Sequence, residues 1–369
     1  MKTFIFPLVV AMAMTGCKKQ AAPAKAAPVT GPFTGQELAQ FAALEPIDAH
    51  AHAFQSDPVF YDMLNRLNLH MVSILVYNDE GPGYPHIQDE IDNGWKFVAG
   101  SDGRAVFCTS FDPYKWNQPG FAARANRQLN KDFDRGAVAV KIWKNVGMEI
   151  KDAKGNYLLP DNPVFAPIYK DIAAHNKTLI AHLAEPDSSW KALDPASPDY
   201  TYYRDHPMWH MYGKPAAASK QQILAARDHL VEMNPGLRVI GAHLGSMESD
   251  FKGLGERLDR YPNFAVDMAA RMPYVMMLPR AEAIAFITRY QDKLLYATDN
   301  EFGAGDKGDA AAISWEDIYA RDWRFLATND TVEYNGRTYA GLALPEPILK
   351  KIFHDNAVKW IPGVLGKEK

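Results

Sequence analysis

From residue 47 onward, short apolar segments alternate with longer stretches of helical periodicity. Eight short segments are rich in apolar, β-branched and aromatic residues and predict strands buried on both faces: Ile47–His50, Val72–Tyr77, Ala105–Ser110, Ala137–Trp143, Thr178–His182, Arg238–His243, Asn263–Asp267 and Lys293–Thr298. Six stretches between them carry apolar residues three and four positions apart and predict helices: Asp57–Arg66, Pro119–Phe133, Val164–His175, Ser219–Met233, Ser249–Tyr261 and Ala281–Tyr290. Strands that alternate with helices pair in parallel through right-handed crossovers, so we expect an α/β fold.

Eight strand–helix units favour one closed (β/α)8 TIM barrel, which we place at residues 36–365, over an open doubly wound sheet. No G-x-G-x-x-G pattern follows any of the strands, which weakens the alternative of an open dinucleotide-binding sheet. After the eighth strand, VEYNGRTY predicts a hairpin with an Asn-Gly turn, and Glu346–Trp360 predicts a closing helix. The barrel should therefore carry a C-terminal helical extension.

The N-terminal sequence MKTFIFPLVVAMAMTGC has a charged start, an apolar run and a cysteine directly after Thr-Gly. The run is too short for a stable transmembrane helix, and M-T-G-C resembles a bacterial lipobox. We predict a lipoprotein signal peptide at residues 1–16, lipidation of Cys17 and a low-complexity, disordered tether at residues 17–35, rather than an ordinary signal peptide with an incidental cysteine. The mature protein would be exported and lipid-anchored to a bacterial membrane, facing the periplasm or the cell exterior.

The charge balance and the cysteine count limit the partners of this chain. The 40 basic residues are balanced by 44 acidic ones, so there is no basic surplus to neutralise phosphates, and nucleic acid is disfavoured as a partner. Cys108 lies in an apolar segment and is expected to be a buried hydrophobic residue; once Cys17 is acylated, no intrachain disulfide can form. A homo-oligomer is compatible with such a barrel, although no segment predicts one.

Titratable side chains stand at the C-terminal ends of five predicted strands: His50 and His52, Lys141, His182, His243 and Asp299. In a TIM barrel these strand ends meet at the face that carries the active site. Burying so many titratable groups in one place is costly unless they are paired or coordinate a cation. Neutral imidazole and carboxylate suit zinc and its neighbours in the first transition row. The sequence therefore predicts a site for a divalent metal, most simply Zn.

The first strand and the residues after it read IDAHAHAF, with two histidines one residue apart. Side chains alternate between the faces of a strand, so Asp48, His50 and His52 are expected to point the same way. Asp48 lies two residues deeper in the barrel than His50. We expect its carboxylate to hold His50 or a neighbour in place.

These strand ends and two longer sequences resemble the amidohydrolase superfamily of metal-dependent hydrolases, in particular its amidohydrolase-related branch. The two sequences are GAHLGSMESDFKGLGERLDRYPNFAVDMAAR and RYQDKLLYATDN, and the resemblance covers nearly all of the predicted barrel. It implies that His50, His52 and His182 are metal ligands, and that His243 either binds the metal or orients the substrate. Asp299 would bind the metal or the attacking water and would move protons.

The role of Lys141 follows from the number of metal ions. In binuclear relatives a lysine at this position is carboxylated and bridges two metals, whereas one metal is usual in the amidohydrolase-related branch. We favour one metal on the resemblance to that branch, although this sequence has every residue that a binuclear site requires. Lys141 is then a substrate contact, and with two metals it is a bridging ligand.

The resemblance implies a metal-dependent hydrolase in which a metal-activated water attacks a carbonyl-type bond of a small molecule: an amide, lactone or ester that can carry a carboxylate. Asp299 and His243 would be the catalytic residues. The alternative is a metal-dependent, non-oxidative decarboxylase of an aromatic or unsaturated acid. A third reading, a non-catalytic lipid-anchored binding protein, is disfavoured because no expected ligand is missing.

Loop residues after two strands are candidates for contacts with the substrate. Trp209 and His210 lie in the sequence HPMWHMYG, which follows the fifth strand and could form a wall of the pocket. Arg271 follows the seventh strand and could pair with an anionic substrate or form a structural ion pair.

Overall fold

The computed structural model describes residues 27–78, 87–197, 199–215 and 217–366. The predicted signal peptide at residues 1–16, Cys17 and the tether up to residue 26 lie outside the described residues. Among the helices of the described part of the chain, none is both long and apolar enough to cross a membrane.

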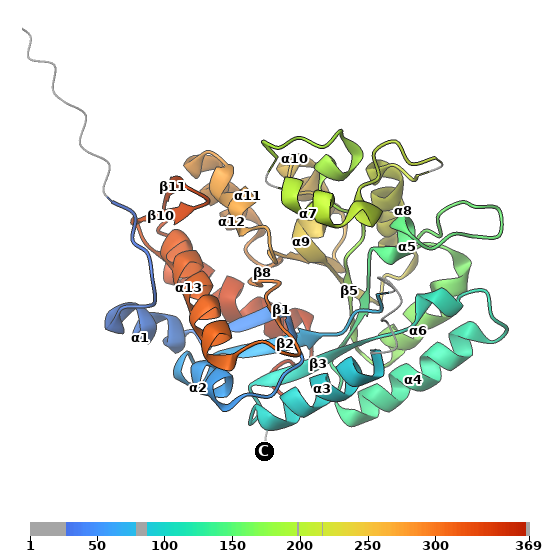
Figure 1. The fold of residues 1–369 in the computed structure, drawn as a ribbon, viewed down its shortest axis with the longest axis horizontal. Helices are drawn as coiled ribbons and strands as arrows, with labels where there is room; N and C mark the ends of the chain where they lie inside the picture. Colours follow the sequence, from blue (N-terminus) through green and yellow to red (C-terminus); the bar gives the residue numbers. More distant parts are fainter. Residues whose placement is uncertain (1–26, 79–86, 198, 216, 367–369) are drawn as a thin grey trace, which may run out of the picture.

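One parallel sheet forms the centre of the described structure, with the strand order β8-β7-β6-β5-β4-β3-β2-β1-β9 (Figure 1). Its strands are β1 Ile47–Ala53, β2 His70–Ile74, β3 Ala105–Ser110, β4 Ala139–Ile142, β5 Thr178–Ala181, β6 Arg238–Gly241, β7 Phe264–Asp267, β8 Leu294–Leu295 and β9 Glu301–Phe302. From β1 to β8, consecutive strands are neighbours, which is the arrangement that successive βα units produce.

Residues 294–302 join the two ends of this sheet. β8 pairs with β7, and β9 pairs with β1. Between these short strands, Ala49 N donates to Tyr296 O and Asp299 N donates to His50 O. The sheet therefore closes on itself as an α/β barrel of the TIM type, which confirms the predicted class of fold.

The predicted eighth strand, Lys293–Thr298, is wrong in its extent. Only Leu294–Leu295 pairs as a strand, because the N–H groups of the next residues bond elsewhere: Tyr296 N donates to Ile352 O, and Thr298 N donates to Asp48 Oδ1. The chain then turns at Asp299, which has left-handed backbone geometry with φ of 65°. A residue in this conformation cannot continue a strand. The first strand is longer than predicted and runs to Ala53, while the other six predicted strands each overlap the observed ones.

Helices surround the sheet (Figure 1). They are α1 Gly35–Ala43, α2 Pro58–Arg66, α3 Ile87–Gly100, α4 Phe121–Arg135, α5 Asn145–Met148, α6 Ala166–Ala174, α7 Tyr200–Asp205, α8 Lys220–Met233, α10 Phe251–Arg260, α11 Met272–Met277, α12 Arg280–Tyr290, α13 Gly308–Ala327, α14 Glu346–Lys350 and α15 Asn356–Trp360. All six predicted helices are present. Three longer helices, α1, α3 and α13, were not predicted, and neither were the short helices α5, α7, α11 and α9, a single helical turn at Ala242–Gly245. The pattern of α13 is hidden because it buries aromatic residues on more than one face.

The C-terminal extension closes one end of the barrel. The predicted hairpin is present as β10 Thr331–Tyr334 and β11 Arg337–Ala340, and the predicted closing helix is α14 and α15 joined by a π-helical turn. Trp360 belongs to the same buried cluster as the barrel residues Ile47 and Val72. The Thr178 hydroxyl, at the start of β5, donates to Trp360 O. The extension therefore covers the N-terminal ends of the strands and leaves the opposite end for the site.

Residues 29–32, in the last part of the predicted tether, are hydrogen-bonded to the barrel domain. Val29 N donates to Thr331 O, and the Arg324 guanidinium of α13 donates to Gly31 O and Pro32 O. The same guanidinium donates two hydrogen bonds of 2.8 Å to Glu37 on α1. Arg324 thus fixes α1 beside α13 (Figure 1).

This ion pair should make the attachment of α1 depend on pH. The hydrogen bond from Arg324 lowers the pKa of Glu37 from 4.5 to about 2. A depressed carboxyl pKa contributes stability above the unfolded value, and that contribution is lost as pH falls from about 4.5 towards 2. Glu37→Gln should cost about 1–3 kcal/mol at pH 6, and the difference in melting temperature from wild type should vanish towards pH 2. A difference that does not change with pH would contradict this assignment.

Candidate metal centre

A β-bulge in β1 overturns the prediction that Asp48, His50 and His52 share one face. The register of β1 with β2 shifts between Asp48 and Ala51, which interrupts the alternation of side chains. Asp48 points towards the outer helix α13, where its carboxylate accepts hydrogen bonds from Tyr319 Oη at 2.9 Å and Thr298 Oγ1 at 2.6 Å. Its Oδ1 also accepts from His50 N at 3.2 Å. Asp48 therefore holds His50 and the residue before Asp299 in place, as expected, but it holds His50 through the backbone and not through the imidazole.

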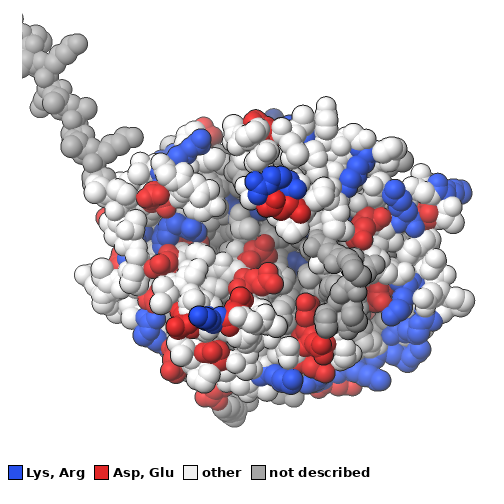
Figure 2. Space-filling view, viewed as in Figure 1, with Lys and Arg blue, Asp and Glu red and all other residues white. Residues whose placement is uncertain are grey.

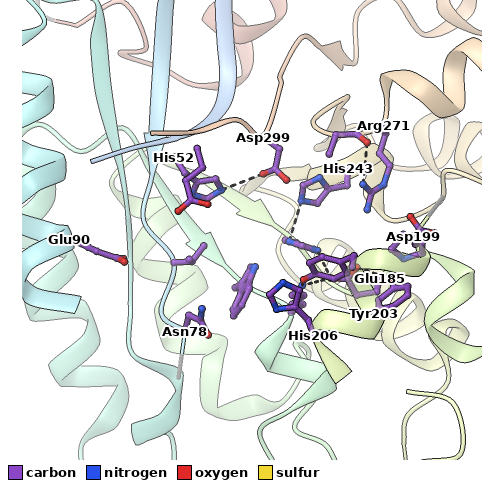
Figure 3. Close-up of a pocket in the computed structure, with 18 of the residues that line it drawn as sticks. His52, Asn78, Glu90, Glu185, Asp199, Tyr203, His206, His243, Arg271 and Asp299 are labelled. Carbon is purple, nitrogen blue, oxygen red and sulfur yellow. Dashed lines mark hydrogen bonds and ion pairs between the residues drawn. The ribbon is translucent and has the colours of Figure 1, made fainter. Parts of the chain in front are cut away.

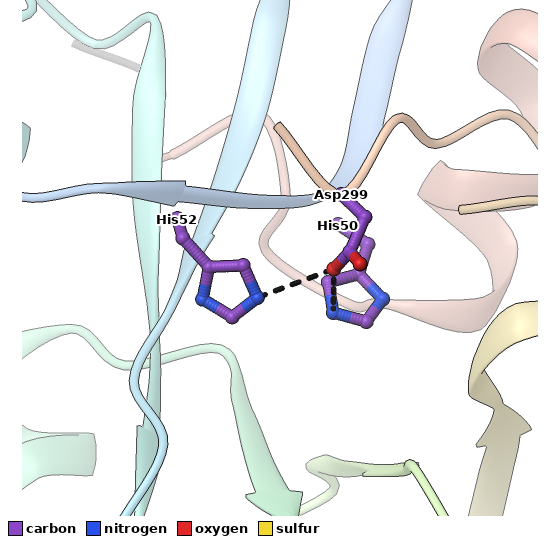
Figure 4. A group of neighbouring side chains, drawn as sticks. All are labelled: His50, His52 and Asp299. Atoms are coloured by element: carbon purple, nitrogen blue, oxygen red, sulfur yellow. Dashed lines mark ion pairs between the residues drawn. The ribbon is translucent and has the colours of Figure 1, made fainter. Parts of the chain in front are cut away.

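His50, His52 and Asp299 bring three ligand atoms together at the C-terminal end of the barrel (Figure 4). The Nε2 atoms of both histidines lie 3.3 Å from Asp299 Oδ1. His50 is fully buried, and the Asp299 side chain is 29% exposed. The group could hold a metal ion, because two imidazole nitrogens and one carboxylate oxygen are donors that suit first-row divalent cations.

Hydrogen bonds on the other ring nitrogens assign the tautomers of these histidines. His52 Nδ1 lies 2.8 Å from Ile74 O, and His50 Nδ1 lies 2.9 Å from Asp267 Oδ2. Both acceptors require a proton on Nδ1, which leaves a lone pair on each Nε2. The lone pair of His52 Nε2 faces the Asp299 carboxylate without a proton between them, and that of His50 Nε2 faces the same carboxylate and Lys141 Nζ at 2.9 Å. A bound cation would relieve the repulsion at His52 and could take the place of Lys141 at His50. The residues present therefore fit a metal ion.

Asp267, at the end of β7, links two of the predicted site histidines and was missed by the sequence analysis. One oxygen accepts from His50 Nδ1; the other accepts from His243 N at 2.7 Å and Ala269 N at 3.2 Å. Burial raises the pKa of Asp267, but the charges and hydrogen bonds of His50 and His243 outweigh burial and hold it below its usual value. The sequence does hold a sign of this residue, because Asp267 is the last residue of a predicted strand and begins the sequence DMAAR.

His243 lies in a strained turn directly after β6. His243, Leu244, Gly245 and Ser246 all have left-handed backbone geometry, with φ between 54° and 62°. For residues other than glycine this conformation costs about 1–3 kcal/mol each and persists only where surrounding contacts impose it. Asp267 accepts from the first residue of the turn, and the buried Arg227 donates to Gly245 O. Strain of this kind gathers at functional sites, and Asp299 shares it.

The four predicted site histidines form a continuous row, in the order His52, His50, His243 and His182. Their successive ring centroids are 5.4, 5.0 and 4.2 Å apart. Burial lowers the pKa of His243 to about 3, so this ring is neutral near pH 7. Its Nδ1 donates to Ala269 O, and its Nε2 therefore accepts from His182 Nδ1 at 3.2 Å.

His182 is not part of the three-residue group, although it lies at the next position in the row. The Nδ1 proton of His182 is donated to His243, so His182 Nε2 carries a lone pair. This atom is buried and has no hydrogen-bond partner among the described residues. His182 therefore keeps one free donor atom at the cavity next to the group.

Lys141 lies behind the group, not in the cavity wall. Its Nζ is 2.9 Å from His50 Nε2, and the side chain is buried. Burial lowers the pKa of Lys141 to about 8, although the Asp299 and Asp267 carboxylates oppose this shift. Lys141 does not line the cavity described next. This position is compatible with a ligand and gives no access to a substrate.

A cavity of about 520 Å³ opens above the group (Figure 3). Its lining includes His52, Asp299, His182 and His243, and also two cations, Lys144 and Arg271. Carboxylates line it as well: Glu90, Glu185, Asp199 and Glu301. Figure 2 shows acidic side chains gathered around a hollow in the middle of this face.

Of the predicted substrate contacts, Arg271 lies in the cavity wall, whereas Trp209 and His210 do not. Trp209 is fully buried and packs behind Trp143, with ring centroids 4.9 Å apart. His210 Nε2 donates to Lys191 O at 2.8 Å. Only tertiary packing decides which residues of this loop reach the cavity: Tyr202, Tyr203 and His206 from the same region do so.

Lys144 and Glu185 were also missed, although each lies three residues after a predicted site residue, Lys141 and His182. They form a buried ion pair in the cavity wall, with side chains 3% and 5% exposed. Both residues could have been recognised in the sequence as charged residues just after a predicted strand. They were not predicted because only residues at the strand ends were considered as site residues.

A sequence profile described as "Amidohydrolase" matches residues 115–362 of the chain. A comparison of this chain with curated proteins found no match.

The chain is similar to several solved structures, among them a 5-carboxyvanillate decarboxylase from Novosphingobium aromaticivorans, at a TM-score of 0.50 and 14% identity over 91% of this chain and 99% of that one. A 2,6-dihydroxybenzoate decarboxylase from Rhizobium has a TM-score of 0.49 and 15% identity over 86% and 98%. A dihydroorotase from Campylobacter jejuni has a TM-score of 0.43 and 12% identity over 85% and 82%. At these identities the likeness concerns the fold.

Proposed function

The chain belongs to the amidohydrolase family, and on this basis we propose that it is a metal-dependent hydrolase of an amide, lactone or ester bond in a small molecule. The observation that carries the proposal is the group of three ligand atoms from His50, His52 and Asp299, of which His52 and Asp299 line the cavity. We propose these residues as metal ligands, with His182 as a fourth and Zn as the metal, and favour one ion over two. Lys141 is proposed as a ligand only if a second ion binds.

A divalent cation bound at this site would supply a Lewis acid for a carbonyl oxygen and would lower the pKa of water to about 7. The residues of the chain supply the rest. Asp299 is the carboxylate among the three proposed ligands, and it lines the cavity. Its role is therefore to accept the proton of the attacking water and to deliver it to the leaving group. His243 accepts from His182 at Nε2 and so orients that ring, which makes His243 a positioning residue in this arrangement.

The alternative reaction, decarboxylation of an aromatic acid, uses the same donor atoms. Aromatic side chains in the cavity wall, Trp143, Tyr202 and Tyr203, favour it because they could pack on a ring. In that case Asp299 would protonate the ring carbon.

Product analysis of the metal-loaded chain decides between the two reactions. We expect a panel of aryl amides, lactones and esters to yield carboxylic acids, and hydroxybenzoates to release no carbon dioxide. Chelation should abolish turnover, and Zn²⁺ or Mn²⁺ should restore it. Carbon dioxide release from an acid in the panel would establish the decarboxylase instead. A chain that binds no metal and turns over nothing would contradict both reactions.

Export and lipid attachment at Cys17 remain part of this proposal, on the sequence pattern of residues 1–17.

A further inference from the structure

Two cations line the cavity, and they differ in how fully they are paired. Lys144 donates hydrogen bonds to Glu185 and to Tyr202 Oη. Its Nζ also lies 4.4 Å from the centroid of the Trp209 ring and 5.1 Å from that of Trp143. A lysine held by a carboxylate, a hydroxyl and aromatic faces has little remaining capacity for a ligand.

Arg271 has unused donors. Its side chain is 12% exposed, and its Nε has no hydrogen-bond partner among the described residues. Its nearest carboxylate oxygen, Glu248 Oε2, is 3.8 Å from Nε, which is an ion pair without a hydrogen bond. Within the described part of the chain, the guanidinium makes one hydrogen bond, from Nη1 to Ala270 O at 3.3 Å, and its Cζ lies 5.8 Å from the centroid of the Tyr274 ring. Burying a guanidinium in this state is costly, and an anion in the cavity would remove the cost.

The backbone around Arg271 fixes it next to the proposed reaction centre. Ala270 N donates to Thr298 O, the residue before Asp299, and Ala269 O accepts from His243 Nδ1. Figure 3 shows Arg271 beside His243 on the cavity wall. An anion at Arg271 would therefore sit in the same cavity as a carbonyl at Asp299.

We propose that Arg271 binds a carboxylate of the substrate while Asp299 and the two histidines of β1 act on a carbonyl elsewhere in the same molecule; this rests on the proposed function. The planar guanidinium matches a carboxylate in geometry and can bind it with two parallel hydrogen bonds. Glu185, Glu248 and Asp299 all act on Arg271 electrostatically.

Binding of two matched series of probes tests this without any turnover. The probes are succinamate, glutaramate and adipamate, each with one amide and one carboxylate, and their neutral diamides. Calorimetry on the full chain loaded with Zn²⁺ should show that at least one of the three carboxylate probes binds about 10- to 100-fold more tightly than the corresponding diamide. In Arg271→Met this preference should disappear, and Arg271→Lys should restore it in part.

Glu248→Gln is the matched control, because it removes the carboxylate nearest to Arg271 and leaves the guanidinium in place. Glu248 also accepts from Lys220 Nζ at 3.0 Å, so this variant is expected to lose some stability of its own. It should keep the preference for the anion. A preference that survives Arg271→Met, or that is absent from every pair in the wild type, would overturn the proposal. Equal losses of melting temperature and of anion preference in Arg271→Met and Glu248→Gln would make the ion pair structural, and would overturn it too. Absence of hydrolysis would count against the proposed function. The binding results would still test the role of Arg271, because they do not depend on turnover.

Discussion

Replacing Asp299 with asparagine is expected to lower kcat by about 10²- to 10⁴-fold while the fold stays intact. The substitution keeps the size of the side chain and removes the group proposed to accept the proton. The backbone bond from Asp299 N to His50 O, which closes the barrel, does not involve the side chain. The melting temperature should therefore change little. Turnover of the substrate found in the product screen is the measurement.

Asparagine can still offer an oxygen to a metal, so metal content must be measured alongside turnover. Saturating Zn²⁺ should restore occupancy in Asp299→Asn and leave turnover low, which separates proton transfer from ligation. Glu301→Gln, which removes another carboxylate of the cavity wall, serves as the control and should keep kcat. Unchanged turnover in Asp299→Asn would remove Asp299 from the proposed proton transfer.

Asp267→Asn is expected to weaken metal affinity by about 10- to 100-fold, although Asp267 is not proposed as a ligand. The carboxylate accepts from His50 Nδ1 with one oxygen and from two backbone N–H groups with the other. An asparagine that keeps its oxygen towards the backbone turns its NH₂ towards His50. His50 must then carry its proton on Nε2, which removes the lone pair offered to the metal. Competition with a chromophoric chelator measures the affinity.

Nitrogen NMR of the imidazoles gives the readout that a purely structural role would not move, because it should show the changed tautomer of His50. The control is Asp322→Asn, since Asp322 is another buried carboxylate, bonded to Tyr296 Oη at 3.2 Å. It should lower the melting temperature and leave metal affinity unchanged. Equal effects of the two variants on affinity would reduce Asp267 to a structural role.

Local patterns predicted the parts of this protein that depend on local chemistry. The positions of most strands follow from runs of buried residues. The helix predicted from Ser219 is present as α8, where Ser219 forms a capping box with Gln222, and the Asn335-Gly336 turn forms the expected hairpin. Strand ends predicted His50, His52 and Asp299 as neighbours because parallel strands of a barrel present their C-terminal ends at one face.

Non-local contacts decided what the sequence pattern predicted wrongly. Perfect alternation in IDAHAHAF places Asp48 with His50, but the bulge that separates them depends on how β1 pairs with β2. Trp209 and His206 lie three residues apart in one loop, and packing buries the first behind Trp143 and exposes the second to the cavity. Neither outcome is encoded in spacing along the chain.

The sequence by itself determined an α/β barrel and a set of histidines and a carboxylate at one end of it, because hydrophobic periodicity and strand ends are properties of short segments. Only the tertiary structure decided how those groups are held. Asp267 reaches from β7 to both His50 and His243, Lys141 is placed behind the group, and Arg271 is left with unused donors. Each of these depends on which distant strand end or loop packs against which, and such contacts form only when the barrel closes.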